Sequence, residues 1–402
     1  MSTFLELALL IALILMAAKL AGYFSVRLGQ PSVLGELLVG ILLGPSLLNI
    51  LHLPFLHHGE QLGETIQELG ELGVLLLMFI AGLELHLDEL TSNTKVSAYA
   101  GIMGVLVPVG MGAVTGLAFG LTTEAALFMG LTLGATSVSI SAQTLMELKQ
   151  LRTRVGLGLL GAAVFDDVMI ILLLSIFLAV FSGGTSLVGI LLIFVKMIFF
   201  LGGAVAFGIY LLPKIVRINE KLPISQRTLA LGLVILLFYG IAAELIGGMA
   251  AITGTFLAGL MFARTATKEK LMQGVSALAY GLFVPIFFVS IGLAVNIRDM
   301  STSALWLTLA VIVVAVISKF LGSGLGARWA GFSWRESWQM GAGMISRGEV
   351  GLIVANVGIG AGLVNGDEFS AIVGMVLATT IITPPFLRAL FTAQEKVNEK
   401  AA

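Results

Sequence analysis

Long apolar stretches follow one another along nearly the whole chain, and only short polar loops separate them. A helix that spans a bilayer needs about 20 consecutive, mostly apolar residues. The pattern therefore predicts thirteen membrane-spanning helices, of which the second and ninth are short and rich in glycine. The predicted spans cover residues 4–26, 31–50, 68–87, 96–120, 124–147, 154–181, 186–213, 226–246, 248–264, 272–296, 303–328, 335–361 and 368–390.

The composition agrees with a protein that lies in a bilayer. Of the 402 residues, 58% are hydrophobic and only 11% are charged, whereas soluble domains carry about 25% charged residues. We therefore expect an all-α, polytopic membrane protein with the lipid bilayer around it. The net charge of −1 gives no indication of a nucleic-acid partner. The chain has no cysteine, which excludes a disulfide framework, a thiol nucleophile and cysteine-ligated metals.

Lysine and arginine are distributed unequally between the two sides of the predicted membrane. With the N-terminus outside, eighteen of the 22 fall in the cytoplasmic loops and tail. Arg298 alone falls outside, while Lys196, Lys319 and Arg347 fall within spans. Because cytoplasmic loops carry the excess of positive charge, this distribution predicts an external N-terminus and a cytoplasmic C-terminus.

The two halves of the chain resemble each other. Residues 35–40 (GELLVG) in the second span resemble residues 254–259 (GTFLAG) in the ninth, and residues 82–87 resemble residues 292–297. Both matches are offset by seven spans, and an odd offset reverses the orientation of a helix in the membrane. The pattern predicts inverted-topology repeats, which are typical of secondary transporters with ion sites near the midplane.

The fifth and twelfth spans are related by the same offset, and both contain interruptions. Residues 134–141 (GATSVSIS) form a polar patch, and residues 341–351 (GAGMISRGEVG) are rich in glycine and charge. Such interruptions at matching places suggest discontinuous helices whose free backbone groups line a site. The alternative is an intact helix in which serine and threonine side chains bond to their own backbone.

Two adjacent carboxylates, Asp166 and Asp167, lie near the middle of the sixth span. A charged side chain at that depth costs about 2.5–3.5 kcal/mol on insertion scales, and such residues usually mark an ion or proton path. Because successive helical residues point about 100° apart, we expect one acid to face a cation of the protein and the other a water-filled cavity. The alternative is a pair of structural hydrogen-bonding groups.

Other charged residues lie at a similar depth in their spans. Lys319 is too deep to reach water easily, and we expect it to form an ion pair with Asp166. A buried lysine titrates readily whereas arginine stays charged, so Lys319 suits a role in proton coupling. Arg347 and Glu349 are better suited to stabilising the ends of the broken helices than to transport.

Several motifs together resemble the monovalent cation:proton antiporter-2 family, above all its NapA- and GerN-like bacterial Na⁺/H⁺ antiporters. The resemblance extends over nearly the whole chain. The motifs are QPSVLGE at residues 30–36, ATS at 135–137, FDD at 165–167, Lys319, and RGEVG at 347–351.

The resemblance implies a thirteen-helix protomer with the NhaA/NapA-like fold, in which two broken helices cross, and which works as a homodimer in the bacterial cytoplasmic membrane. Its domains would be dimerisation helices 1–3 (residues 1–95), core helices 4–6 (96–181), linker helix 7 (182–222), dimerisation helices 8–10 (223–300), core helices 11–13 (301–390) and a cytoplasmic tail (391–402).

The resemblance also implies roles for individual residues. Asp167 would be the main carrier of Na⁺ and H⁺, and Asp166 would pair with Lys319 when no ion is bound. Thr136 and Ser137 would lie beside the ion, so that Na⁺ contacts Asp167, Asp166 and Thr136. Glu349, together with Arg347, would stabilise the crossing.

The expected activity is exchange of Na⁺ or Li⁺ for H⁺ at one site, with no resident cofactor. If Lys319 also released a proton, two protons could move for each Na⁺, and exchange would be electrogenic. Relatives that export K⁺ often carry glutamine in place of Asp166 and a cytosolic nucleotide-binding domain. We expect no such regulatory domain in this chain, although K⁺/H⁺ or Na⁺/H⁺-K⁺ exchange stays an alternative.

Two rivals come from other functional classes. An intramembrane aspartyl protease needs two carboxylates that face each other, normally from two helices, and here they are adjacent on one. A cation channel needs a ring of ligands around an open pore. The sequence favours a transporter, not an enzyme.

Overall fold

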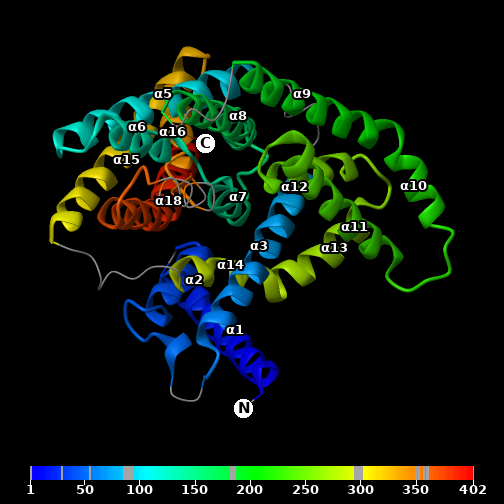
Figure 1. Cartoon of the computed structure of the whole chain (residues 1–402). Helices are drawn as coiled ribbons and strands as arrows, with labels where there is room; N and C mark the ends of the chain where they lie inside the picture. The colour runs from blue at the N-terminus through cyan, green and yellow to red at the C-terminus, as the bar shows by residue number, and fades with distance from the viewer. Residues whose placement is uncertain are drawn as a thin grey trace. The chain divides into compact units, whose positions relative to one another are not determined.

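The computed structural model describes residues 2–28, 30–53, 56–84, 94–181, 187–293, 302–348, 351, 354–355, 358 and 362–401. Within these residues the regular structure is helical throughout (Figure 1). The longer helices are α1 (Thr3–Arg27), α3 (Gly59–Glu84), α5 (Thr94–Ala118), α8 (Arg154–Phe181), α9 (Leu187–Tyr210), α11 (Arg227–Ala242), α15 (Thr302–Trp329) and α18 (Gly366–Ala401). The shorter ones are α2 (Ser32–Leu43), α6 (Thr123–Gly134), α7 (Val138–Glu147), α10 (Leu212–Asn219), α12 (Ala251–Phe262), α13 (Lys268–Leu278), α14 (Val284–Leu293) and α16 (Trp334–Gly343).

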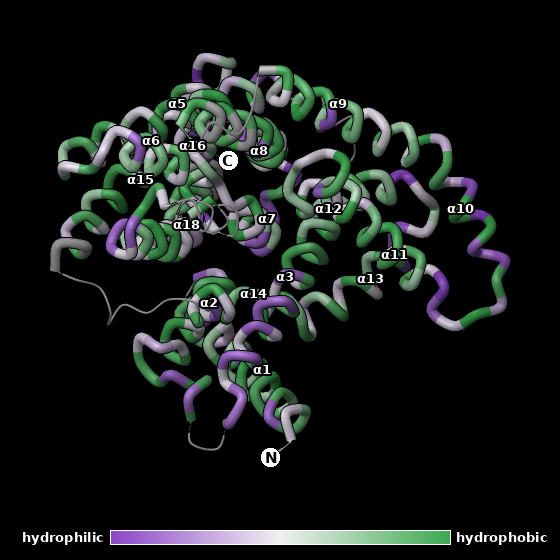
Figure 2. Tube along the Cα trace, in the orientation of Figure 1, coloured by the Kyte–Doolittle hydropathy of each residue, from purple (hydrophilic) through white to green (hydrophobic). Residues whose placement is uncertain are grey.

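Ten stretches of the described chain are long and apolar enough to cross a membrane. Each coincides with one of the predicted spans, and the predicted second and ninth spans coincide with the shorter apolar helices α2 and α12. The predicted twelfth span begins with α16 and continues into residues that are described only in part. The protein is therefore an all-helical, multi-pass membrane protein, and the count of thirteen spans stays a prediction. Apolar residues dominate most of the helices (Figure 2).

Helix α3 begins at Gly59, nine residues before the start of the predicted third span. In its first turns Leu62 and Ile66 are buried, whereas Glu60 and Glu64 are exposed. The apolar side chains of these turns recur at helical spacing. The glutamates between them lower the mean hydropathy of residues 59–67 below that of a membrane span.

The chain forms two compact units. Unit 1 comprises Met1–Ile66, Asn93–Leu173 and Phe288–Ala402, and unit 2 comprises Gln67–Ser92 and Leu174–Phe287. The predicted division into core and dimerisation helices stays a prediction.

Within unit 1, α15 packs against α5, α16 and α18, and α5 packs against α6. The contact between α5 and α15 is close because glycines lie in it: a Cβ atom on Gly322 would lie 2.6 Å from the Met103 carbonyl oxygen. Small residues permit such an approach between membrane helices. Within unit 2, α11 packs against α12 and α13.

Candidate functional site

The two predicted interruptions are present, and they contact each other within unit 1. Helix α6 ends at Gly134 and α7 begins at Val138, while α16 ends at Gly343 and residues 345–348 are not helical. The Ser137 backbone N–H donates to the Ser346 carbonyl oxygen at 2.8 Å, and the Ser346 hydroxyl donates to the Ser137 carbonyl oxygen at 2.7 Å. Regular helix is thus interrupted at both predicted places within the described residues, and the crossing of two broken helices stays a prediction.

Two hydroxyl groups, those of Ser141 and Ser346, bond between the two interruptions, whereas the Ser137 and Ser139 hydroxyls lie 2.9 Å from each other. The Ser141 hydroxyl donates to the Gly343 carbonyl oxygen at 2.5 Å and lies 3.0 Å from the Ser346 hydroxyl. The alternative of an intact helix is wrong at residues 135–137, and bonding of a hydroxyl to its own helix occurs beyond them, where Thr144 donates to the Ile140 carbonyl oxygen. These contacts hold the start of α7 against the end of α16.

Two buried cations bind the end of α6. Lys319 Nζ donates to the Gly134 carbonyl oxygen at 2.6 Å, and Arg347 Nη2 donates to the Leu133 carbonyl oxygen at 2.7 Å. The last carbonyls of a helix have no partner inside the helix and form its negative end. Lys319 and Arg347 therefore satisfy the broken end of α6 and neutralise its partial charge.

Arg347 also stabilises its own segment. Its Nη1 donates to the Ile345 carbonyl oxygen, and its own carbonyl oxygen accepts a hydrogen bond from the Thr380 hydroxyl of α18. Because Arg347 is completely buried, these backbone contacts help to compensate for the loss of hydration of the guanidinium.

Lys319 and Asp166 form an ion pair between α15 and α8. Lys319 Nζ lies 3.0 Å from Asp166 Oδ1, and the exposed fractions of the two side chains are 0% and 1%. The sequence predicts this contact from the depth of the two residues in their spans. Removing one partner of a buried pair leaves an uncompensated charge, at a cost of about 3–5 kcal/mol.

Two oxygen atoms at this ion pair, one of them on Asp166 itself, are available as ligands. Asp166 Oδ2 and Thr136 Oγ1 are both buried, and neither makes a well-formed hydrogen bond within the described residues. The Thr136 hydroxyl interacts with the Asp166 carboxyl, and Thr136 lies in the interruption between α6 and α7. Buried oxygen atoms without a donor are costly, so this position suits a cation or a water molecule.

Asp167 is the next residue of α8 and is buried to a smaller extent than Asp166, with 8% of its surface exposed. Its carboxylate interacts electrostatically with Lys319. Of the predicted site residues, the structure thus brings Thr136, Asp166, Asp167 and Lys319 together, and it places Ser137 next to Thr136. Their roles in transport stay predictions, and Glu349 lies outside the described residues.

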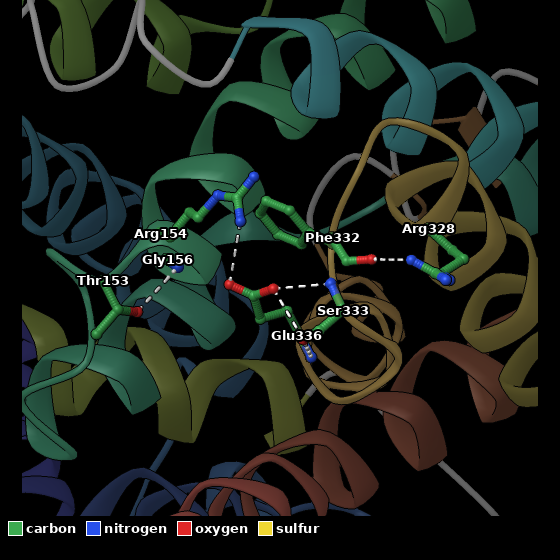
Figure 3. A network of polar contacts seen from close by, with 7 residues as sticks. All are labelled: Thr153, Arg154, Gly156, Arg328, Phe332, Ser333 and Glu336. Atoms are coloured by element: carbon green, nitrogen blue, oxygen red, sulfur yellow. Dashed lines mark hydrogen bonds and ion pairs between the residues drawn. The ribbon is translucent and has the colours of Figure 1, made fainter.

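A polar network joins the start of α8, the helix that carries Asp166 and Asp167, to the start of α16 (Figure 3). Arg154, the first residue of α8, lies 3.5 Å from Glu336 of α16. Glu336 accepts hydrogen bonds from both the backbone N–H and the hydroxyl of Ser333 at 2.8 Å, which completes a capping box at the start of α16. The network fixes the start of α8, twelve residues before Asp166, against the start of α16.

One interhelical contact escapes prediction from the sequence. Glu147, the last residue of α7, accepts hydrogen bonds from the Ser32 backbone N–H at 2.7 Å and the Ser32 hydroxyl at 2.6 Å. Pro31 precedes α2 and gives it no side-chain cap, and this missing cap is the signal that a partner from elsewhere in the chain is needed.

Known antiporters are similar to this chain along nearly its whole length. The profile of the family described as "Sodium/hydrogen exchanger, transmembrane" matches residues 11–393. The chain is 42% identical to the Na⁺/H⁺-K⁺ antiporter GerN of Bacillus cereus, over 96% of each chain. It is 36% identical to a Na⁺/H⁺ antiporter of Enterococcus hirae, over 97% of this chain and 99% of the relative.

Solved structures have a similar fold. The structure of the sodium proton antiporter MjNhaP1 from Methanocaldococcus jannaschii at pH 8 covers 97% of both chains with a TM-score of 0.65 at 18% identity. At that level of identity the similarity shows the fold alone.

Proposed function

The chain belongs to the transmembrane sodium/hydrogen exchanger family, and from this premise we propose that it exchanges Na⁺ or Li⁺ for H⁺ across the cytoplasmic membrane of a bacterium. The observation that carries this proposal is the buried Asp166–Lys319 pair, which lies at the end of an interrupted helix. The family and its named antiporter relatives support transport and not an enzymatic reaction.

The donor set fits an alkali cation. In the proposal, Na⁺ binds between the carboxylates of Asp167 and Asp166 and the Thr136 hydroxyl, with Ser137 beside them. Hard cations take oxygen ligands, and the unused Asp166 Oδ2 and Thr136 Oγ1 supply two of them. Lys319 and Arg347 keep the site close to neutral before the cation arrives, because each positive charge lies near a carboxylate or a helix end.

Competition for the carboxylates produces the exchange. A proton and a metal cation can each neutralise a carboxylate. Burial away from water disfavours the bare, charged carboxylate, so the site binds either a proton or a metal cation from the solution. Occupied Asp167 crosses the barrier with either Na⁺ or H⁺, so the two ions move in opposite directions on one site.

Lys319 makes the exchange electrogenic in this proposal. When Na⁺ engages Asp166, the ion pair opens and the Lys319 ammonium releases its proton to the facing solution. When Na⁺ leaves, Lys319 takes up a proton from the other side and the pair closes again. One proton on Asp167 and one on Lys319 then cross for each Na⁺, which moves one net charge per cycle.

The finer architecture is also part of the proposal. Thirteen spans, with inverted repeats related by an offset of seven and a crossing of the two broken helices, are supported by the paired shorter helices α2 and α12 and by the contact between Ser137 and Ser346. Alternating access would come from movement of the core helices against a dimerisation domain in a homodimer, with the N-terminus outside and the C-terminus in the cytoplasm. Glu349 would stabilise the crossing.

K⁺ is the second candidate cation. A relative that is 42% identical is named as a Na⁺/H⁺-K⁺ antiporter, and the oxygen ligands above suit either ion. Purified protein in proteoliposomes tests both: we expect Na⁺ or Li⁺ to dissipate an imposed pH gradient, and a response to K⁺ alone would assign the second function.

A further inference from the structure

Helices α11 and α13 of unit 2 begin side by side, and a pocket opens at their first turns. A Cβ atom on Gly274 of α13 would lie 3.2 Å from a methyl group of Leu229 in α11, so the two helices are closely packed at this end. The pocket has a volume of about 510 Å³ and is lined by Gln226, Arg227 and Thr228 on one side and by Lys270 and Gln273 on the other.

The surroundings of this pocket are strongly positive. The segments that lead into the two helices, residues 211–227 and 263–270, contain seven basic residues and two acidic ones, Glu220 and Glu269. Arg227 and Lys270 lie in the pocket wall itself. In addition, neither α11 nor α13 has a side-chain cap at its start, so the positive ends of both helices add to the charge.

The predicted membrane spans place this pocket near the level of the phospholipid headgroups. Arg227 and Lys268 are the first residues of two candidate membrane spans, Arg227–Gly247 and Lys268–Leu293, and the preceding candidate span ends at Tyr210. The spans predicted from the sequence begin at residues 226 and 272, and the ends of a membrane span lie near the surface of the bilayer. Figure 2 shows hydrophilic residues gathered at α10 and the segment that follows it.

Exposed apolar side chains accompany the charge. Ile218 and Ile224 are 64% and 56% exposed, and Ile224 forms part of the pocket wall. On α10, Leu212 and Val216 are buried against the protein, while Lys214 and Arg217 are exposed. Basic and apolar groups on one surface are the combination that binds anionic lipid.

We propose that this pocket binds a phosphate group, held by Arg227 and Lys270, with Gln273 and Gln226 as neutral donors, and that an anionic phospholipid headgroup supplies it. Arginine presents several N–H donors in a plane that matches phosphate. Arg227 uses Nη1 to bond the Leu222 carbonyl oxygen at 2.7 Å, which fixes the guanidinium at the pocket. The adjacent Ile224 gives the acyl chains an apolar surface.

The test is a titration of the purified full-length protein in detergent, with melting temperature as the readout. The ligands are short-chain phosphatidylglycerol, phosphatidylcholine and inorganic phosphate. The pocket variants are Lys270→Gln, which removes a charge, and Gln273→Glu, which places a negative charge at an exposed position with little change in shape. The double variant Lys214→Gln/Arg217→Gln is the control, because it removes two charges from the same basic region outside the pocket.

We expect phosphatidylglycerol, but not phosphatidylcholine, to raise the melting temperature of the wild type and the control. In Lys270→Gln the affinity should fall about tenfold, since one interaction with a charged group is lost, and in Gln273→Glu it should fall further. Stabilisation by inorganic phosphate that Lys270→Gln weakens would support the pocket with a free anion as its ligand. Equal affinity in the wild type and both pocket variants, or an equal loss in the control, would overturn the proposal.

Discussion

The Lys319 ammonium joins Asp166 to the end of α6: Nζ lies 3.0 Å from Asp166 Oδ1 and 2.6 Å from the Gly134 carbonyl oxygen. The two acceptors come from different elements, a side chain on α8 and the backbone of an interrupted helix. A change in the charge of Lys319 therefore alters both an ion pair and a helix end. This coupling makes the site sensitive to ion binding and to substitution.

The first prediction concerns the stability of this pair. Lys319→Gln leaves Asp166 buried without its cation and should lower the free energy of unfolding by about 3–5 kcal/mol, or less if Asp166 becomes protonated. The double variant with Asp166→Asn should recover part of this loss, because no unpaired charge remains. A thermal-shift double-mutant cycle measures the coupling. Strictly additive losses from the two substitutions would contradict a stabilising pair.

The second prediction separates proton coupling from stability. Asp167 remains in Lys319→Gln, so exchange should continue, but with one fewer titrating group it should become close to electroneutral. The measurement is the rate of Na⁺-driven proton movement in proteoliposomes, with an imposed membrane potential and with the potential clamped at zero. A variant whose rate responds to potential as strongly as the wild type would show that Lys319 carries no transported proton.

The Asp166–Lys319 pair is predictable from the sequence because membrane depth is one-dimensional. Counting residues from the start of a span gives the depth of a side chain, and few charged groups share that depth. The bond from Lys319 to Gly134 is not predictable in this way. It depends on the residue at which α6 ends, and glycine-rich polar patches permit several end points.

A helix cap that comes from a residue far away in the sequence is equally difficult to predict. Glu147 and Ser32 are separated by 115 positions in the chain, and each reads locally as an ordinary polar residue at a helix end. The start of α3 is hidden for another reason, since exposed glutamates in its first turns conceal a regular amphipathic pattern. Hydropathy finds the apolar part of a helix, whereas caps and polar turns depend on the tertiary fold.

The third prediction tests Thr136 as a ligand. Thr136→Val removes a hydroxyl that lies beside the Asp166 carboxyl but makes no well-formed hydrogen bond among the described residues, so the melting temperature should change little. Loss of one oxygen from the cation site should raise the apparent KM for Na⁺ about tenfold. Thr132→Val is the matched control, because the Thr132 hydroxyl is buried but bonds the Met129 carbonyl oxygen of its own helix at 2.7 Å. Equal KM values in the two variants would remove Thr136 from the site.

The fourth prediction concerns the contact between α7 and α2. Glu147→Ala leaves the Ser32 backbone N–H without its acceptor and should cost about 1–2 kcal/mol, comparable to the loss of a helix cap. Glu64→Ala, which removes an exposed glutamate, should cost less than about 0.5 kcal/mol. Chemical denaturation in detergent compares the two variants, and similar values for both would show that the Glu147 contact adds no stability.

The central claim is that Asp167 carries both the cation and the proton, and one measurement tests it most directly. Wild type and Asp167→Asn are reconstituted at equal amounts, checked for folding by melting temperature, and assayed for dissipation of a pH gradient on addition of Na⁺. Asparagine preserves the size of the side chain but can neither titrate nor carry charge. The account predicts exchange in the wild type and none in a folded Asp167→Asn protein; normal Na⁺/H⁺ exchange by the variant would contradict it.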